Sequence, residues 1–209
     1  METAKISKKL LKRLPIYLAH LKSLPENSNV SATSMAKALG LGDVQVRKDL
    51  AKVSEAGRRR TGRSREQLIQ DIEHYLDFAV HTGTVIVGAG KLGRALLDYA
   101  GFEESGLNVM AGFDILPCAE RSENGKPIYP MSRLDSFCKH YDVHIGVITV
   151  PAESAQSICD YLVACGITAI WNFAPVHLKV PDHVVVQSEN LAVSLTALRM
   201  QMKNQKPFC

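Results

Sequence analysis

The chain has 209 residues, of which 46% are hydrophobic and 22% charged, a globular composition with room for two small domains. No apolar run is long enough to span a bilayer, and the basic N-terminus lacks an apolar signal core, so we expect a cytoplasmic protein with no membrane partner. Five scattered cysteines without a C-x-x-C pair, and seven histidines without ligand spacing, argue against a disulfide framework and against a metal site.

The charge is unevenly distributed along the chain. Residues 1–80 carry 15 Lys and Arg against 9 Asp and Glu, whereas residues 81–209 carry 10 against 12. The first part therefore has a net charge of +6 and the remainder −2. This asymmetry indicates that only the first part meets a polyanion such as DNA.

The first eighty residues predict helices with little strand. Leucines at helical spacing between 10 and 21 predict a helix that Pro15 either divides or kinks. A second helix is expected over 34–39, ending at a glycine, and a third over 44–53, capped by Asp43. Two short helices joined by a glycine-containing turn are the pattern of a helix-turn-helix.

Polar residues open the second helix of that motif, which enters the major groove in helix-turn-helix proteins. Gln45, Arg47 and Lys48 lie in its first turns, where Gln suits adenine and Arg or Lys suits guanine. The alternative is a solvated helix face with local ion pairs. The stretch 57–65, with five arginines in nine residues, follows as an exposed loop or hairpin in the place of a wing. Its candidate DNA contacts are Arg58, Arg59, Arg60 and Arg63.

After a helix capped by Ser64, the pattern changes near residue 84 to alternating strands and helices. Strands are expected over 84–87, 107–113, 143–150, 167–171 and 184–186, and helices over 92–102, 131–140, 152–165 and 188–202. Residues 115–130 are expected to form an irregular excursion rich in Pro and Gly. Alternating elements with short connections predict an α/β fold with a doubly wound parallel sheet.

A glycine-rich motif follows the first of these strands. Gly88-Ala89-Gly90-Lys91-Leu92-Gly93 reads G-x-G-x-x-G. The first glycine allows a tight turn, the second lets the backbone approach a pyrophosphate, and the third lets the next helix pack closely. Asp114 follows 21 residues after the last glycine, where it can accept hydrogen bonds from an adenosine ribose. The pattern predicts a dinucleotide site, and its alternative is a glycine-rich turn that binds nothing.

Several segments together resemble one known family. They are Gln45-Val46-Arg47-Lys48-Asp49-Leu50, Gly88 to Leu97, Asp98-Tyr99-Ala100-Gly101-Phe102, Phe113-Asp114, Thr149-Val150-Pro151-Ala152 and Asn172-Phe173-Ala174-Pro175-Val176. Over nearly the whole chain the sequence resembles the redox-sensing transcriptional repressors called Rex.

The resemblance implies a winged helix-turn-helix DNA-binding domain over 1–80 and a Rossmann-like NAD(H)-binding domain over 81–187. A C-terminal helix over 188–209 would pack across a homodimer on inverted-repeat operator DNA. NADH and NAD⁺ would act as competing regulatory ligands, with NADH closing the dimer and releasing DNA, and the protein would not be an enzyme.

The resemblance also assigns roles by position. Gly88 to Gly93 would hold the pyrophosphate, Asp114 the adenosine ribose, and Tyr99 would couple the nicotinamide state to closure. The residues implied to line the nicotinamide side are Thr149, Val150, Pro151, Asn172, Ala174 and Pro175.

Two regions depart from the family pattern. In the wing, only Gly57, Arg59 and Gly62 keep register, and the aromatic residues are mostly replaced by charge. At position 190 the family commonly has Asp, whereas this chain has Asn, which leaves the coupling of redox state to DNA open.

Two other functions are weighed against the repressor. A small NAD-dependent oxidoreductase would need a proton donor, for which His177 and Tyr99 are the nearby candidates, and a substrate domain for which no length remains. A CoA-binding module with a basic N-terminal extension would share the glycine turn, but it would explain neither the basic first part nor Asp114.

Overall fold

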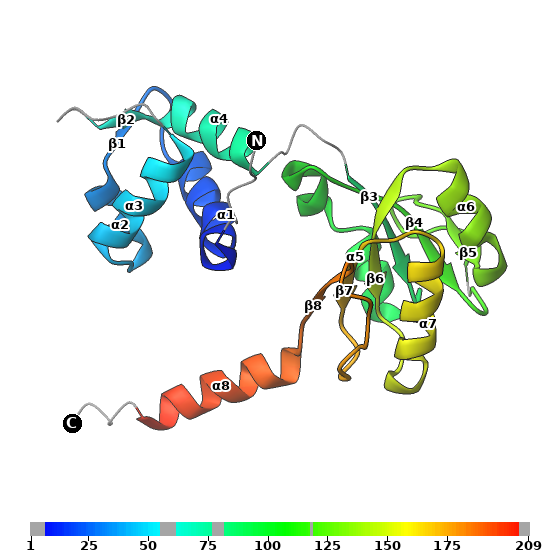
Figure 1. The fold of residues 1–209 in the computed structure, drawn as a ribbon. Coiled ribbons are helices and arrows are strands. Elements are labelled where there is room, and N and C mark those ends of the chain that lie inside the picture. Colours follow the sequence, from blue (N-terminus) through cyan, green and yellow to red (C-terminus); the bar gives the residue numbers. More distant parts are fainter. Residues whose placement is uncertain (1–6, 55–61, 77–81, 118, 205–209) are drawn as a thin grey trace. The chain divides into compact units, whose positions relative to one another are not determined.

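The computed structural model describes residues 7–54, 62–76, 82–117 and 119–204. The chain divides into two compact units, Met1–Val80 and His81–Cys209 (Figure 1).

In its described residues, the first unit has four helices and one short pair of strands. The helices are α1 (Lys8–Ser23), α2 (Ala32–Leu39), α3 (Asp43–Val53) and α4 (Arg65–Tyr75), and the antiparallel strands are β1 (Asn29–Val30) and β2 (Arg63–Ser64). Helix α1 is continuous through Pro15. Residues 55–61, with Arg58, Arg59 and Arg60, lie outside the described residues, whereas Arg63 belongs to β2.

One core holds the helices of this unit together. Its buried side chains are Leu10, Leu14, Tyr17, Leu18, Leu21, Val30, Met35, Ala36, Val46, Leu50, Leu68 and Ile72. Helix α1 supplies five of these twelve side chains, four of them leucines at helical spacing, so the amphipathic pattern visible in the sequence is the pattern that folds this unit.

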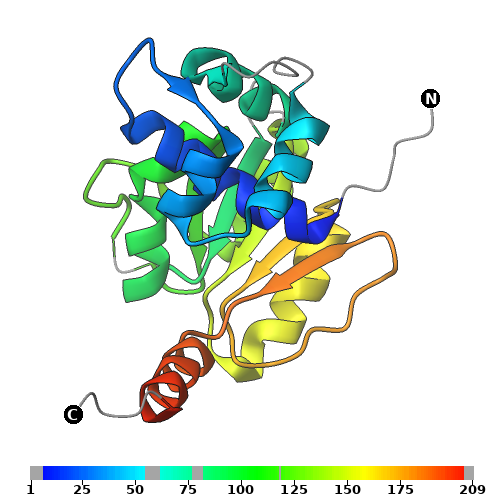
Figure 2. The same cartoon turned by 90° about the vertical axis from the view of Figure 1, so that its left-hand side faces the viewer.

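The described part of the second unit contains a six-stranded sheet. Its strands are β3 (Thr82–Val87), β4 (Leu107–Asp114), β5 (Ile128–Pro130), β6 (Val143–Ile148), β7 (Ala169–Asn172) and β8 (Val185–Ser188). They run in the order β5-β4-β3-β6-β7-β8 and every neighbouring pair is parallel (Figure 2). The order reverses between β3 and β6, and ligands of such sheets bind at the carboxyl ends of the strands beside this point.

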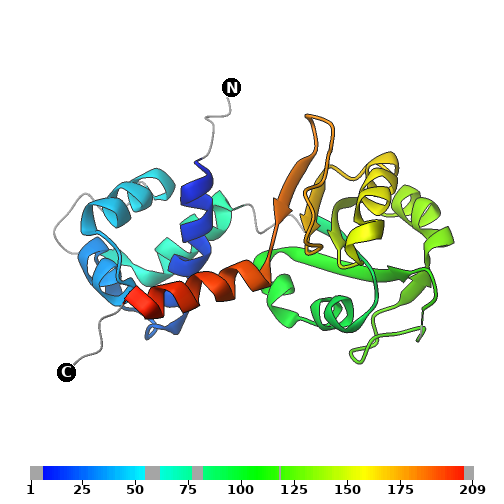
Figure 3. The ribbon, with the colours of Figure 1, turned by 90° about the horizontal axis from the view of Figure 1, so that it is seen from below.

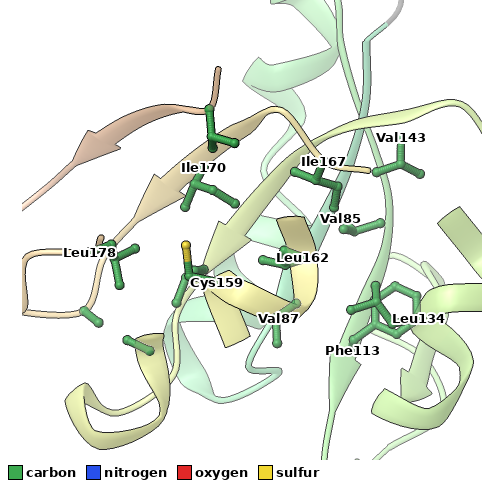
Figure 4. Close-up of a cluster of buried hydrophobic side chains, with 14 of the residues drawn as sticks. Val85, Val87, Phe113, Leu134, Val143, Cys159, Leu162, Ile167, Ile170 and Leu178 are labelled. Carbon is green, nitrogen blue, oxygen red and sulfur yellow. The ribbon is translucent and has the colours of Figure 1, made fainter. Parts of the chain in front are cut away.

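Helices cover both faces of this sheet, as Figure 3 shows. Beside α8 (Leu191–Asn204), the helical segments are α5 (Lys91–Leu97), η1 (Ala100–Ser105), η2 (Met131–Arg133), α6 (Leu134–His140) and α7 (Ala152–Ala164). Val85 and Val87 face α6 and α7 in the larger core, which Figure 4 draws, whereas Ile86 faces Leu97 of α5 on the opposite side. The alternation follows from the two-residue period of a strand.

The structure differs from the sequence-based predictions at three points. The helix predicted over 92–102 ends at Leu97 and gives way to the 3-10 turn η1. Strands β1 and β5 were not expected, because two or three residues are too short to show a period and β5 ends at Pro130. Asp43 is the first residue of α3 and Gly42 its N-cap, so the predicted cap by Asp43 is wrong.

Candidate functional sites

The turn between α2 and α3 is fixed by its glycines and by Asp43. Gly40 ends α2 in the left-handed region at φ +64°, where a side chain would be strained. Asp43 accepts a hydrogen bond from Thr33 Oγ1 at 2.7 Å, which connects the start of α3 to α2. The carboxylate is thus used as a brace between the two helices.

Helix α3 presents one polar face to solvent. Gln45, Arg47 and Lys48 are exposed, as a base-reading surface requires, whereas Val46 and Leu50 are buried in the core. Arg47 Nη2 also pairs with Asp43 Oδ2 at 2.5 Å, with the arginine side chain 66% exposed. The local ion pair that the sequence offered as an alternative therefore exists. At this exposure it is a weak interaction, which leaves Arg47 available for contacts with DNA.

Asp49 is a buried carboxylate at the centre of a hydrogen-bond network. It accepts from Arg13 Nε at 2.7 Å, Tyr17 Oη at 2.9 Å and Gln45 Nε2 at 2.8 Å. Burial alone would raise the pKa of the Asp49 carboxyl, but the hydrogen bonds from Arg13, Tyr17 and Gln45 outweigh it and lower that pKa. Burial and the neighbouring Asp49 raise the pKa of Tyr17 to about 12. The network ties helix α3 to α1.

In the second unit, the glycines of the motif have three different surroundings. Gly88 has φ +100°, and a Cβ there would lie 2.9 Å from the carbonyl carbon of Thr149. A Cβ on Gly93 would lie 1.9 Å from Gly88 O, so only glycine lets α5 come this close to the turn. A Cβ on Gly90 would meet no atom within 4 Å. The space that Gly90 leaves open is where a phosphate could approach the backbone.

Two side chains brace this turn. Thr149 Oγ1 donates to Gly88 O at 2.7 Å, and its backbone N–H donates to Val87 O at 2.9 Å. Asp114 Oδ2 accepts from the backbone N–H of Ala89 at 2.7 Å. Asp114 thus holds the turn in addition to the predicted role toward a ribose, since a carboxylate oxygen has further lone pairs to offer.

A cavity of about 200 Å³ opens beside the turn, at the carboxyl ends of β3, β4 and β6. It is lined by six predicted residues, Gly88, Gly90, Asp114, Thr149, Val150 and Pro151, and by Val87, Ile115, Met131, Ser154 and Ile158. No sequence motif had indicated the last four of these residues. Ser154 and Ile158 are one turn apart on α7, but their position over the strand ends depends on packing that the sequence does not display.

The other predicted cofactor residues lie outside this cavity. Leu92 and Tyr99 are exposed, and Lys91 lines a separate opening along α5. The ring of Tyr99 packs edge-on against that of Phe102, with ring centroids 5.0 Å apart. Phe102 in turn packs edge-on against Trp171, with ring centroids 5.8 Å apart. A row of rings therefore connects Tyr99 with the end of β7, where the predicted segment 172–175 begins.

Asn172 is fully buried and its side chain is used internally. Its Nδ2 donates to Ala174 O at 3.1 Å and to Val176 O at 3.0 Å, and its Oδ1 accepts from Ala174 N at 2.9 Å. Asn172 therefore shapes the loop that carries Ala174, which is buried, and Pro175, which is exposed.

Among the described residues, no three His, Cys, Asp or Glu side chains gather as a metal site would require. In the same part of the chain, every helix is too short or too polar to cross a bilayer.

Comparison with known proteins covers both units. Residues 5–51 match the family described as "Putative DNA-binding protein N-terminus", and residues 80–176 match "CoA binding domain". The "Redox-sensing transcriptional repressor Rex" of Porphyromonas gingivalis is 38% identical over 203 residues, covering 96% of this chain and 93% of the relative. The protein of the same name from Bacteroides thetaiotaomicron is 38% identical over 201 residues, covering 95% and 91%.

Solved structures agree with the sequence relatives. The crystal structure of RSP in complex with β-NAD⁺ and operator DNA is similar with a TM-score of 0.88 at 30% identity, covering 97% of this chain and 95% of that one. The complex of RSP with β-NADH gives a TM-score of 0.82 at 30% identity, covering 97% of both chains. A helix-turn-helix with an exposed polar face, a parallel sheet with a glycine-rich turn, and relatives that are named repressors rather than enzymes lead to one assignment: the chain belongs to the Rex family of redox-sensing transcriptional repressors.

Proposed function

We propose that this protein is a homodimeric, cytoplasmic repressor that binds inverted-repeat operator DNA and is released from it by NADH. The observation that carries the proposal is the pairing, in one chain of this family, of an exposed polar face on α3 with a braced G-x-G-x-x-G turn. The related RSP structures contain NAD⁺ with operator DNA, and NADH.

The DNA-binding domain would be residues 1–80. Gln45, Arg47 and Lys48 would read or hold the major groove, and Arg63, with Arg58 to Arg60, would contact the backbone or minor groove beside it. The positive charge of this part supports that role, because phosphate contacts by Lys and Arg dominate DNA affinity.

The dinucleotide domain would be residues 81–187. The residues fit the cofactor: the open space at Gly90 admits a pyrophosphate, Asp114 can accept from a ribose, and Ile115, Met131 and Ile158 form apolar walls suited to an adenine. Lys91 and Leu92 would lie along the phosphates, and Tyr99 with Val150, Pro151, Ala174 and Pro175 would form the nicotinamide side. When bound, NAD(H) supplies a ring whose charge depends on its redox state, which is the signal the protein would read.

The C-terminal segment 188–209 would form the dimer contact. Helix α8 exposes its apolar side chains, with Leu195 68% and Leu198 54% exposed. Two recognition helices related by a two-fold axis would then lie about one DNA turn apart, which requires an inverted repeat.

The proposal is tested by fluorescence anisotropy of labelled operator DNA at fixed salt, with NADH and NAD⁺ titrated separately. We expect NADH to weaken DNA binding and NAD⁺ to leave it nearly unchanged, because only differential affinity for two states shifts an equilibrium. Equal effects of both nucleotides would exclude redox sensing while leaving DNA binding intact.

The match to "CoA binding domain" gives one specific reason to test CoA as a ligand. A thermal shift with CoA and none with NADH would favour the CoA-binding module.

A further inference from the structure

A second opening lies along helix α5, which follows the glycine turn. It has a volume of about 590 Å³, and we call it the α5 groove. Its lining residues are Lys91, Arg94, Ala95 and Asp98 of helix α5 and its C-cap, and Ala119, Arg121, Ser122 and Glu123 of the segment that follows β4. It shares no lining residue with the cavity at Asp114.

The groove is held in shape by side-chain contacts. Asp98 accepts from Ser122 Oγ at 2.5 Å, from the backbone N–H of Glu123 at 3.1 Å and from that of Asn124 at 3.3 Å. Asn124 Nδ2 in turn donates to Asp98 O at 3.1 Å. The carboxylate of Asp98 therefore fixes the segment against α5, and its negative charge offsets one of the three positive charges of the groove.

Three cations line the groove: Lys91, Arg94 and Arg121. None of them forms an ion pair with any residue that the structure describes. Arg121 Nη1 donates to Gly125 O at 2.7 Å, which fixes the guanidinium and leaves its other N–H groups free for a ligand. The remaining acid of the lining, Glu123, is exposed.

Arginine and lysine converging on one groove are the side chains that recognise phosphate, because the guanidinium fork matches two phosphate oxygens. A free phosphate ion would occupy only a small part of about 590 Å³, which is the size of a site for a small organic molecule. We propose that the α5 groove binds a phosphomonoester, the terminal phosphate of a small molecule, held by Arg94 and Arg121 with support from Lys91.

The first experiment uses calorimetric titration of the full-length protein with inorganic phosphate at constant ionic strength. We expect saturable binding that weakens at least tenfold in Arg94→Ala/Arg121→Ala. The control is Lys179→Ala, which removes an exposed cation of the same unit outside the groove and should leave phosphate binding unchanged. Arg94→Gln and Arg121→Gln, made singly, serve if the double variant fails to fold. No saturable binding, or equal binding by protein and groove variants, would overturn the proposal.

The second experiment identifies the source of the phosphate. CoA and dephospho-CoA differ by one phosphomonoester on the adenosine ribose. Tighter binding of CoA, abolished in the groove variants, would show that a ribose phosphate occupies the groove, whereas equal binding with phosphate binding retained would assign the site to another phosphomonoester. Energy transfer from Trp171 to NADH is recorded in parallel, so a failure of the dinucleotide site is detected separately from a failure of the groove.

Discussion

Gly90 and Gly93 both belong to the glycine-rich turn, but the missing side chain does something different at each position. Around Gly93 the space is filled by the protein itself, since a Cβ would lie 1.9 Å from Gly88 O. Around Gly90 the space is open and the backbone, at φ −71°, suits any residue. One glycine therefore serves the fold and the other serves the ligand.

This difference gives a matched pair of variants. Gly93→Ala should lower the thermal stability of the protein, with a cost of about 1–3 kcal/mol or more from overpacking. Gly90→Ala should leave stability unchanged or slightly higher, yet weaken NADH binding at least tenfold, because its methyl group takes the place of the phosphate. Thermal unfolding and energy transfer from Trp171 measure the two effects. Equal NADH affinity of Gly90→Ala and the parent protein would show that the pyrophosphate does not lie at this turn.

Thr149 acts through one hydroxyl. Replacing it with Val keeps the shape but removes the hydrogen bond to Gly88 O, at a cost of about 1–3 kcal/mol if that carbonyl is left unsatisfied. We expect Thr149→Val to weaken NADH binding by loosening the turn, and Thr149→Ser to restore most of it. Titration of both variants with NADH tests this, since a loss of affinity in Thr149→Ser with none in Thr149→Val would place the contribution in the methyl group.

Asp49 makes the first unit sensitive to acid. Its carboxyl pKa is lower in the folded protein than its ordinary value near 3.8, so the unfolded chain takes up the proton first. The stability that Asp49 contributes is complete above about pH 4 and is lost as the pH falls through the folded pKa. Asp49→Asn should therefore lose helical stability at neutral pH and show less further loss on acidification.

The control for this titration is Asp71→Asn, whose carboxylate accepts from Gln67 on the surface of α4. Helical content followed by circular dichroism between pH 7 and pH 2 compares the variants. An acid transition unchanged by Asp49→Asn would mean that other carboxylates determine it.

At the scale of elements, helix α8 exposes apolar side chains along its length. Leu191, Leu195, Leu198 and Met202 follow one another at helical spacing, and Leu195 is 68% exposed. A helix with this much exposed apolar surface needs a partner surface, and a second copy of the chain is the proposed one.

Leu195→Glu should therefore convert the dimer to monomer and reduce operator affinity, because the two half-sites would no longer be bound together. Gln201→Glu adds the same charge elsewhere on α8 and should leave the dimer intact. Sedimentation equilibrium gives the masses. A dimer that survives Leu195→Glu would place the contact on another element.

The sequence predicted those elements whose signal is local. The β-branched run before Gly88 and the glycines after it indicated β3, the turn and the start of α5, and the leucines of α1 indicated its buried face. Strand β5 and the pair β1–β2 were not predicted, because they form only by pairing with strands that are distant in sequence. For the same reason Met131, Ser154 and Ile158 were missed, since only the folded sheet brings them to the cavity.

At the scale of the whole molecule, the proposed repressor joins two ligands through one equilibrium between DNA-competent and closed states. If NADH weakens operator binding by a given factor, operator DNA must weaken NADH binding by the same factor, because the coupling free energy belongs to both. Typical couplings are about 5–150-fold, or about 1–3 kcal/mol. The effect of operator DNA on NADH binding can be measured through the single Trp171, which lies next to the segment proposed for the nicotinamide side.

We therefore expect the NADH dissociation constant, measured by energy transfer from Trp171, to rise on saturating operator DNA by the factor found in the anisotropy titration. Gly90→Ala should abolish the NADH effect on DNA while leaving operator affinity without nucleotide unchanged. Asn190→Asp also tests the coupling, because it introduces a charge directly before α8 and changes no residue that lines the cavity or belongs to α3. If Asn190→Asp changes the shared factor while the affinity for each ligand alone stays constant, position 190 takes part in the linkage. A factor of one in both titrations would show that NADH and operator DNA are not coupled.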